Sequence, residues 1–273
     1  MFIFDFNIHL PCNKNSDINF KTLDENNMFL DDFEVCYKNY FDSFKFSIQA
    51  GNFMLFNQNL FFEDNMGTFI KKVKNDFKGS LFTALIDFRK QNVLSYLDKA
   101  ISDGIDCIKF HSYNQKITEA DFIEIVKICK YAEDRNIVIC IDTSYGTSKM
   151  YDYDNMKLAC FISDFILKTP IVLLHTGGAR VIEAMLLADE KKNIFLDTSF
   201  SIVYYLDSSL EKDFAYTYKK IGSSRVLYGS DTPYINLNES IEQTIEFLEK
   251  YKFSSNDIEN ILYNTGKNLK SHL

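Results

Sequence analysis

The segment Arg225-Val-Leu-Tyr-Gly-Ser-Asp-Thr-Pro-Tyr234 combines a short apolar strand, an abrupt turn and a carboxylate within ten residues. Val226–Tyr228 has the pattern of a buried strand, Gly229 allows a close turn, and Pro233 prevents the strand from continuing. Folds of the α/β class place their chemistry at the carboxyl ends of buried strands. The segment therefore predicts a functional Asp231, with a cap of the following turn as the alternative role.

The composition is that of a globular protein with one large core. The chain has 273 residues, of which 46% are hydrophobic and 25% are charged. Because α/β barrels of about 250 residues form single domains, we expect residues 1–273 to form one domain. The 38 acidic residues outnumber the 30 basic ones and give a net charge of −8. This charge argues against a nucleic-acid partner held by phosphate contacts.

Cysteine usage and the absence of long apolar runs indicate the cellular compartment. The six cysteines include no C-x-x-C pair, and several lie inside apolar runs, which fits a reducing cytoplasm. Met1–Asp5 is too short and too early charged for a signal peptide and is predicted to begin the first strand. No apolar run approaches the about 18 residues of a membrane span. We therefore expect a soluble, cytoplasmic protein without a membrane partner; a homo-oligomer stays open.

Short apolar runs alternate with stretches of helical periodicity along the chain. Eight runs have the length of buried strands, and eight is the number at which a parallel sheet closes into a barrel. The predicted strands are Phe2–Phe6, Phe44–Ile48, Leu81–Ile86, Ile105–Phe110, Ile137–Ile141, Ile171–Leu174, Ile194–Leu196 and Val226–Tyr228. The sequence therefore predicts a single (β/α)8 TIM barrel of the α/β class, with an open doubly wound sheet as the alternative.

Helix signals occupy the gaps between these strands. Thr118-Glu-Ala-Asp121 resembles a capping box and opens a periodic run. The other predicted helices are Asn59–Phe77, Val93–Ile101, Tyr153–Leu167, Ala179–Ala188, Val203–Ile221 and Ser240–Tyr251. Ser254 and Asp257 open an extra C-terminal helix toward Leu273, which we expect to pack on the outside. The polar stretch Pro11–Asp42 is too long for a plain connection and is predicted to form a lid over the site.

Candidate functional residues follow the predicted strands. Asn7-Ile-His9 follows the first strand, Lys109-Phe-His111 ends the fourth, and Asp142 and His175 follow the fifth and sixth. In a barrel these positions meet at one rim. A single histidine at a strand end is often structural, but several together favour a functional site. Imidazole and carboxylate groups together suit zinc, iron or manganese.

Other residues near these strand ends suggest anion binding. His175 is followed by Gly177 and Gly178, whose backbone N–H groups can meet an anion. Lys109 and Arg180 can pair with a substrate carboxylate, and each can instead form a structural salt bridge. The chain has no Gly-rich phosphate-binding turn, so neither a nucleotide nor another organic cofactor is expected. We therefore expect a small-molecule substrate, with a carboxylate as one option.

Five segments together resemble the amidohydrolase superfamily. They are Asp5-Phe-Asn-Ile-His9, Gly104-Ile-Asp-Cys-Ile-Lys-Phe-His111, Val172-Leu-Leu-His-Thr-Gly-Gly178, Asn193-Ile-Phe-Leu-Asp-Thr-Ser199 and Val226-Leu-Tyr-Gly-Ser-Asp-Thr-Pro233. More narrowly, they are similar to the amidohydrolase-related branch, which includes aminocarboxymuconate semialdehyde decarboxylase and pyrone dicarboxylate lactonase. The resemblance covers almost the whole chain and is weakest between Pro11 and Asp76.

The resemblance implies a TIM barrel whose carboxyl rim holds one divalent metal or, in some members, none. Metal-bearing members use both histidines of an H-x-H on the first strand, a histidine on the fifth strand and an aspartate on the eighth. A histidine on the sixth strand contacts the substrate. By position these residues correspond to Asn7, His9, Asp142, Asp231 and His175. Asn7 and Asp142 therefore replace two histidine ligands.

This replacement changes the expected metal site. Asparagine is a poor transition-metal ligand and aspartate a good one, so the expected ligands are His9, Asp142 and Asp231, with the Asn7 oxygen as a possible addition. An oxygen-rich set shifts the preference from zinc toward manganese or magnesium. A metal-free site stays open, and in that version Asn7, His9 and Asp142 orient the substrate through hydrogen bonds.

The expected activity is hydrolysis, in which water attacks the carbonyl carbon of a small ester, lactone or amide. Asp231 is the expected general base, with or without a metal, and His175 the expected stabiliser of the oxyanion. Lys109 or Arg180 is expected to anchor the substrate, and His111 to contact it. The alternatives are a metal-assisted non-oxidative decarboxylase and a non-catalytic barrel that binds a small molecule.

Overall fold

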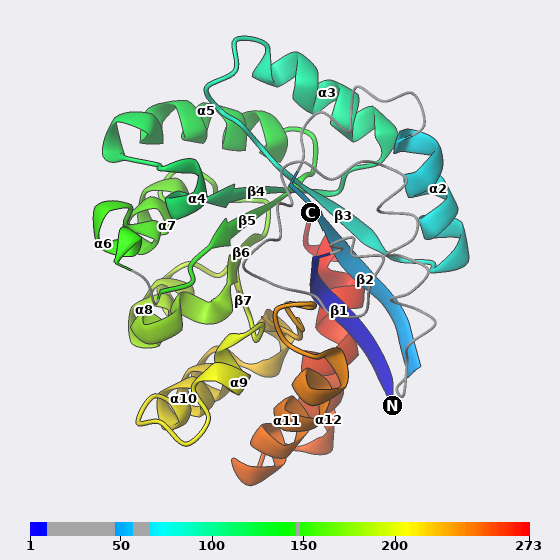
Figure 1. Ribbon diagram of the computed structural model, residues 1–273, viewed down its shortest axis with the longest axis vertical. Coiled ribbons are helices and arrows are strands. Elements are labelled where there is room, and N and C mark those ends of the chain that lie inside the picture. Colours follow the sequence, from blue (N-terminus) through cyan, green and yellow to red (C-terminus); the bar gives the residue numbers. More distant parts are fainter. Residues whose placement is uncertain (10–46, 57–65, 146–147) are drawn as a thin grey trace.

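The computed structural model describes residues 1–9, 47–56, 66–145 and 148–273. Its eight strands form one sheet in which each strand pairs in parallel with the next along the chain (Figure 1). They are β1 (Phe2–His9), β2 (Ser47–Leu55), β3 (Leu81–Leu85), β4 (Cys107–His111), β5 (Val138–Asp142), β6 (Ile171–Leu174), β7 (Ile194–Asp197) and β8 (Val226–Leu227). This consecutive order confirms the predicted TIM barrel and rules out the doubly wound alternative, whose strand order reverses.

Backbone hydrogen bonds join β8 and the segment after it to β1 and so close the barrel. The Phe6 N–H donates to the Tyr228 carbonyl at 2.8 Å, and the Asp231 N–H donates to the Asn7 carbonyl at 2.9 Å. The first and last strands therefore carry their functional side chains to the same part of the rim.

Helices surround the sheet on its outer face (Figure 1). They are α2 (Met66–Asp76), α3 (Val93–Asp103), α4 (Ser112–Gln115), α5 (Phe122–Glu133), α6 (Lys149–Asp152), α7 (Asn155–Ser163), α8 (Val181–Glu190), α9 (Ser201–Tyr204), α10 (Glu211–Ile221), α11 (Leu237–Lys250), α12 (Ser255–Glu259) and α13 (Thr265–Asn268). Shorter helical segments are η4 (Glu119–Asp121), η5 (His175–Arg180), η6 (Ser223–Arg225), η7 (Asn260–Asn264) and η8 (Leu269–His272). The predicted capping box before α5 is present. In the described parts of the chain, no helix has the length and apolar character needed to cross a membrane.

The hydrophobic core has two parts, one inside the barrel and one between the sheet and the helices. Alternation along β4 sorts the side chains between them: Cys107 lies in the inner part and Ile108 in the outer part. Because successive side chains of a strand point to opposite faces, Lys109 and His111 share the inward direction of Cys107. The strand pattern therefore sends these two polar side chains toward the barrel mouth.

The second strand corrects the predicted boundaries. The prediction was Phe44–Ile48, of which residues 44–46 lie outside the described residues, whereas the strand continues to Leu55. The apolar-run criterion missed most of it because Gly51 and Asn52 interrupt the apolar residues. A Cβ at Gly51 would approach the Asp5 carbonyl oxygen to 2.9 Å, so glycine at this position allows the close pairing with β1. The predicted lid Pro11–Asp42 lies outside the described residues.

Two of the predicted helices are interrupted in the structure. The predicted helix Val203–Ile221 is divided into α9 and α10. Asp207 between them has φ +57°, a left-handed conformation that a continuous α-helix does not contain. The helix predicted to begin after Ser254 does so, but the π-helical turn η7 interrupts it.

The C-terminal segment also packs differently from the prediction of an outside helix. Leu269 belongs to the core inside the barrel, and a Cβ at Gly266 would lie 2.5 Å from the Phe4 ring. Figure 1 shows these last helices in red beside β1 in blue. Since Phe4 lies near the start of β1, the segment covers the barrel end opposite the strand carboxyl termini.

Candidate active site

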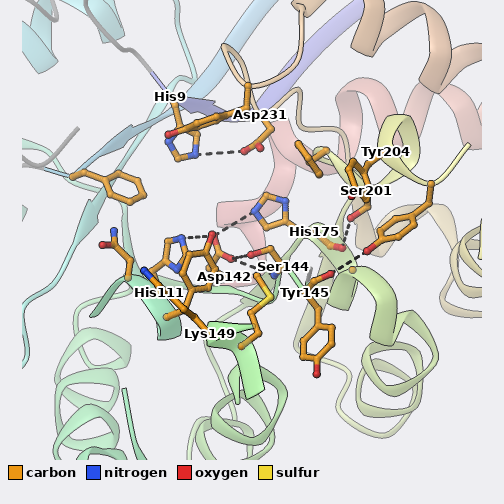
Figure 2. A pocket seen from close by; sticks show the side chains of 18 of the residues that line it. His9, His111, Asp142, Ser144, Tyr145, Lys149, His175, Ser201, Tyr204 and Asp231 are labelled. Carbon is orange, nitrogen blue, oxygen red and sulfur yellow. Dashed lines mark hydrogen bonds and ion pairs between the residues drawn. The ribbon is translucent and has the colours of Figure 1, made fainter. Parts of the chain in front are cut away.

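A cavity of about 590 Å³ is formed at the carboxyl ends of the strands. Its lining includes predicted site residues that follow or end five different strands: His9, His111, Asp142, His175 and Asp231. Figure 2 shows His9 and Asp231 on one side, Asp142 and His111 on the other, and His175 between them. The structure therefore brings these side chains, which are distant in sequence, around one cavity.

The first side of the cavity, here called the Asp231 wall, consists of Asp231 and His9, which line the cavity, and of Asn7 behind them. Asp231 Oδ1 accepts a hydrogen bond from Asn7 Nδ2 at 3.0 Å and lies 3.5 Å from His9 Nε2. Asn7 is fully buried, and its Nδ2 also donates to Ser199 Oγ at 2.9 Å. The asparagine therefore holds the carboxylate in place from behind and does not line the cavity.

The turn after β8 aims Asp231 at the cavity. Gly229 is needed there because a Cβ would overlap Asp197 Oδ2 and approach the Asn7 Cβ to 3.0 Å. The buried Asp5 carboxylate accepts hydrogen bonds from Ser230 N at 2.8 Å and Ser230 Oγ at 2.6 Å. A carboxylate on the first strand thus fixes the residue immediately before the functional aspartate.

The opposite side, here called the Asp142 wall, consists of Asp142, Lys109, His111 and His175. Asp142 Oδ2 lies 3.1 Å from Lys109 Nζ, 3.3 Å from His175 Nε2 and 3.5 Å from His111 Nε2. Its Oδ1 accepts a hydrogen bond from Ser144 Oγ at 2.6 Å. Burial alone would raise the pKa of Asp142, but His111, Lys109 and His175 hold that pKa well below its usual value.

The two histidines of this wall differ in charge. His175 Nδ1 faces the Ser199 carbonyl oxygen at 3.1 Å and its Nε2 faces Asp142 Oδ2, so both ring nitrogens have acceptors and both carry hydrogen. Burial lowers the pKa of His175, but Asp142 and Asp231 outweigh it and raise the value to about 9. Burial lowers the pKa of His111 to about 4. At neutral pH the wall therefore contains a cationic His175 and a neutral His111.

Asp197 at the end of β7 holds the backbone around His175. Its Oδ1 accepts the His175 N–H at 2.7 Å, the Ser199 N–H at 3.1 Å and the Ser199 hydroxyl. Burial raises the pKa of Asp197 to about 6. The sequence analysis assigned no role to Asp197, Ser199 or Ser144. Their position just after predicted strands was the feature that could have marked them as site residues.

The two expected substrate anchors are not among the residues that line the cavity. Lys109 is 1% exposed and its ammonium contacts Asp142. Arg180 donates from Nη1 to Asp154 at 2.6 Å and from Nε to Glu183 at 2.9 Å. Their predicted contact with a substrate carboxylate therefore stays a prediction.

Two other lysines line the cavity. Lys116 and Lys149 are solvent-exposed, and neither ammonium forms an ion pair with a carboxylate of the described residues. Aromatic side chains complete this part of the lining: Phe56, Tyr113, Tyr145, Phe200, Tyr204, Tyr205 and Tyr234. Sequence reasoning missed both lysines because they follow the strands by several residues and belong to no recognisable motif.

The expected metal ligands can be compared with the donor atoms in place. His9 and Asp231 are neighbours, but both oxygens of Asp142 already contact protein groups, including the Lys109 ammonium. Asn7 presents its NH₂ group, not its oxygen, toward Asp231. Within the described ranges, no three His, Cys, Asp or Glu side chains are placed to hold a metal ion. Because an ammonium next to the same oxygen repels a divalent cation, this donor set does not fit one.

The fold and the cavity define a TIM-barrel protein with its polar residues at the carboxyl rim, as in enzymes of this architecture. The family model described as amidohydrolase matches residues 90–266, and the chain belongs to this family. No curated protein sequence matches it.

Three solved structures share the fold. An uncharacterised TIM-barrel protein from Bordetella bronchiseptica has a TM-score of 0.75 at 15% identity, covering 100% of this chain and 99% of its own. A probable 2-pyrone-4,6-dicarboxylic acid hydrolase from Acinetobacter baumannii with citric acid bound has a TM-score of 0.64 at 14% identity, covering 99% and 100%. A dihydroxybenzoic acid decarboxylase from Polaromonas with bound manganese and the inhibitor 2-nitroresorcinol has a TM-score of 0.59 at 10% identity, covering 98% and 96%. At these identities the likeness concerns the fold.

Proposed function

We propose that this chain hydrolyses a small ester, lactone or amide, with Asp231 as the general base. The observation that carries the proposal is the placement of the Asp231 carboxylate. It lines the cavity together with the cationic His175 and is held by the neutral Asn7 amide. A carboxylate and an imidazolium that line one small cavity can accept a proton and stabilise negative charge, respectively.

The reaction divides into two steps. Asp231 takes a proton from a water molecule, and the water oxygen attacks the substrate carbonyl carbon. The carbonyl oxygen becomes negatively charged and accepts a hydrogen bond from His175 Nε2, whose contact with Asp142 is long at 3.3 Å. The bond to the leaving oxygen or nitrogen then breaks, and the proton on Asp231 passes to that atom. The products are a carboxylic acid and an alcohol or amine; a lactone instead opens to a single hydroxy acid that carries both groups.

His9 contributes to the position of the base. Its ring lies 5.3 Å from the Tyr234 ring in an edge-on arrangement and 5.1 Å from the Phe56 ring, measured between centroids. Its Nε2 is 3.5 Å from Asp231 Oδ1. Packing between two aromatic rings therefore holds the imidazole beside the carboxylate, where it restricts the direction of proton transfer.

The substrate we propose is small and carries a carboxylate. The cavity volume of about 590 Å³ is in the range of small-molecule sites. Lys116 and Lys149 line it as exposed cations and can pair with a carboxylate. The fold neighbour described as a probable 2-pyrone-4,6-dicarboxylic acid hydrolase is named for such a substrate and has citric acid bound, which supports this choice of substrate class.

The test is a panel of small esters, lactones and amides, each with and without a carboxylate. We expect turnover of a carboxylate-bearing member and a decrease of kcat/KM by about 10³ in Asp231→Asn. Asp98→Asn, which changes an aspartate that pairs with Arg135 on the outer surface, serves as the matched control. Carbon dioxide release from an aromatic acid would support the decarboxylase instead. Ligand binding without turnover, unchanged in Asp231→Asn, would support the non-catalytic alternative.

A further inference from the structure

The Asp142 wall holds its charges without solvent around them. Lys109, Asp142 and His175 are 1%, 2% and 6% exposed. An unpaired charge at such a position is strongly unfavourable, so the two cations and the carboxylate depend on each other. The wall retains positive charge in total, because one carboxylate faces two cations.

Lys109 places its charge next to the cavity without touching it. Its Nζ lies 3.1 Å from Asp142 Oδ2 and 5.0 Å from the centroid of the Phe56 ring. Phe56, Asp142 and His175 all line the cavity. The ammonium is therefore directly behind the lining, where little solvent screens its effect on the cavity.

We propose that Lys109 and His175, held by Asp142, supply the positive charge that a divalent metal would otherwise supply at this rim. Asp142 is then their counter-ion and not a metal ligand. A metal ion bound to Asp142 Oδ2 would lie next to the ammonium that already contacts this oxygen. Charge repulsion between the two cations therefore opposes metal binding, while an anion in the cavity is favoured.

This inference uses the same cavity as the proposed hydrolysis but concerns its charge, so the test measures binding and not turnover. In the first measurement, the purified wild-type protein is dialysed against Zn²⁺ or Mn²⁺, and the bound metal is determined by elemental analysis. We expect well below one equivalent. Calorimetric titration with inorganic phosphate, the anion probe, should give binding at one site.

The decisive variant is Lys109→Met, which keeps the length of the side chain and removes its charge. We expect the phosphate affinity to fall about tenfold and the Mn²⁺ affinity to rise about tenfold, since the repelling charge is gone and a carboxylate is freed. The double variant Lys109→Met/Asp142→Asn lacks that carboxylate and should show no gain in Mn²⁺ affinity.

The matched control is Lys74→Met. Lys74, like Lys109, is paired with an aspartate, Asp106, at 2.6 Å, but it is partly exposed and neither residue lines the cavity. Lys74→Met should change neither the phosphate affinity nor the Mn²⁺ affinity. If Lys109→Met does not fold, as judged by circular dichroism, His175→Gln replaces it and should lower the phosphate affinity about tenfold.

Two results would overturn the proposal. One is a full equivalent of Zn²⁺ or Mn²⁺ on the wild-type protein that Asp142→Asn removes. The other is a folded Lys109→Met variant with wild-type affinities for both phosphate and Mn²⁺. A protein that passes these tests but hydrolyses nothing would contradict the proposed function and leave this inference intact.

Discussion

The Asp231 wall and the Asp142 wall each present one aspartate to the same cavity, but their surroundings are opposite. The two aspartates are similarly buried, at 6% and 2% exposure. Asp231 is held by the neutral amide of Asn7, whereas Asp142 contacts an ammonium and an imidazolium. Because the burial is similar, the neighbouring groups must account for the difference between the two aspartates. Asp231 is placed to accept a proton, and Asp142 is placed to balance positive charge.

The geometry of each wall follows from this division. An amide donor fixes the orientation of Asp231 without adding a charge beside it. The cations around Asp142 hold its pKa well below the usual value, which makes it a poor proton acceptor. The two aspartates therefore depend on different neighbouring groups. Substitutions on the Asp231 wall and on the Asp142 wall should have different effects.

The largest expected difference is in stability. Asp142→Asn leaves Lys109 and His175 buried without their counter-ion and should lower the free energy of unfolding by about 3–5 kcal/mol. Asp231→Asn keeps an oxygen for the Asn7 hydrogen bond and should lower it by about 1 kcal/mol or less. Urea denaturation at pH 7 measures both. Equal losses in the two variants would show that the walls do not differ as described.

The second expected effect is a dependence of stability on pH that comes from the Asp142 wall. His175 has a pKa raised to about 9 in the folded protein, so its contribution is present in full below its unfolded pKa of about 6.5. It is lost as the pH rises from there through about 9. We expect the free energy of unfolding to fall by up to about 3 kcal/mol over this interval.

Thermal or urea denaturation at a series of pH values measures this loss. His175→Gln should remove most of the slope, whereas His272→Gln, at the opposite end of the barrel beside Phe195, should keep it. Asp197, with a folded pKa raised to about 6, is mostly ionised at the start of the interval and adds to the loss only there, because a raised carboxyl pKa makes ionisation less favourable in the folded protein. A slope that survives in His175→Gln would assign the effect to another group.

The third expected effect tests how Asn7 holds the base. Asn7→Ala removes the hydrogen bond to Asp231 Oδ1 and should lower kcat by about 10- to 100-fold with little change in KM. A role in substrate binding would raise KM instead. Asn256→Ala, an exposed asparagine of α12, is the control and should leave both constants unchanged.

The smallest expected effect concerns the exposed lysines of the cavity. Lys116→Gln and Lys149→Gln should each raise KM for a carboxylate-bearing substrate by about tenfold and leave kcat nearly unchanged, because they bind a part of the substrate that does not react. Substrates without a carboxylate should not be affected. Lys127→Gln, which changes an exposed lysine of α5 paired with Glu124, is the matched control.

Much of the fold was predictable because it depends on local patterns. Apolar runs separated by helical periodicity indicate eight parallel strands, and the structure contains them. The prediction was wrong where the pattern is interrupted, as in β2 with its Gly51 and Asn52, and where a left-handed residue, Asp207, divides a helix. The C-terminal segment was misplaced because its contact with Phe4 inside the barrel has no signature of its own.

The residue types that follow the strands can be read from the sequence, and they are enough to place histidines and aspartates at the carboxyl rim. Which of these side chains are partners depends on the folded barrel. Asn7 and Asp231 are 224 residues apart, and their hydrogen bond exists because the barrel closes between the first and last strands. Likewise, Lys109 meets Asp142 because β4 and β5 are neighbours in the sheet. A carboxylate acquires its chemical role from the charges within a few ångströms, and those charges come from other strands.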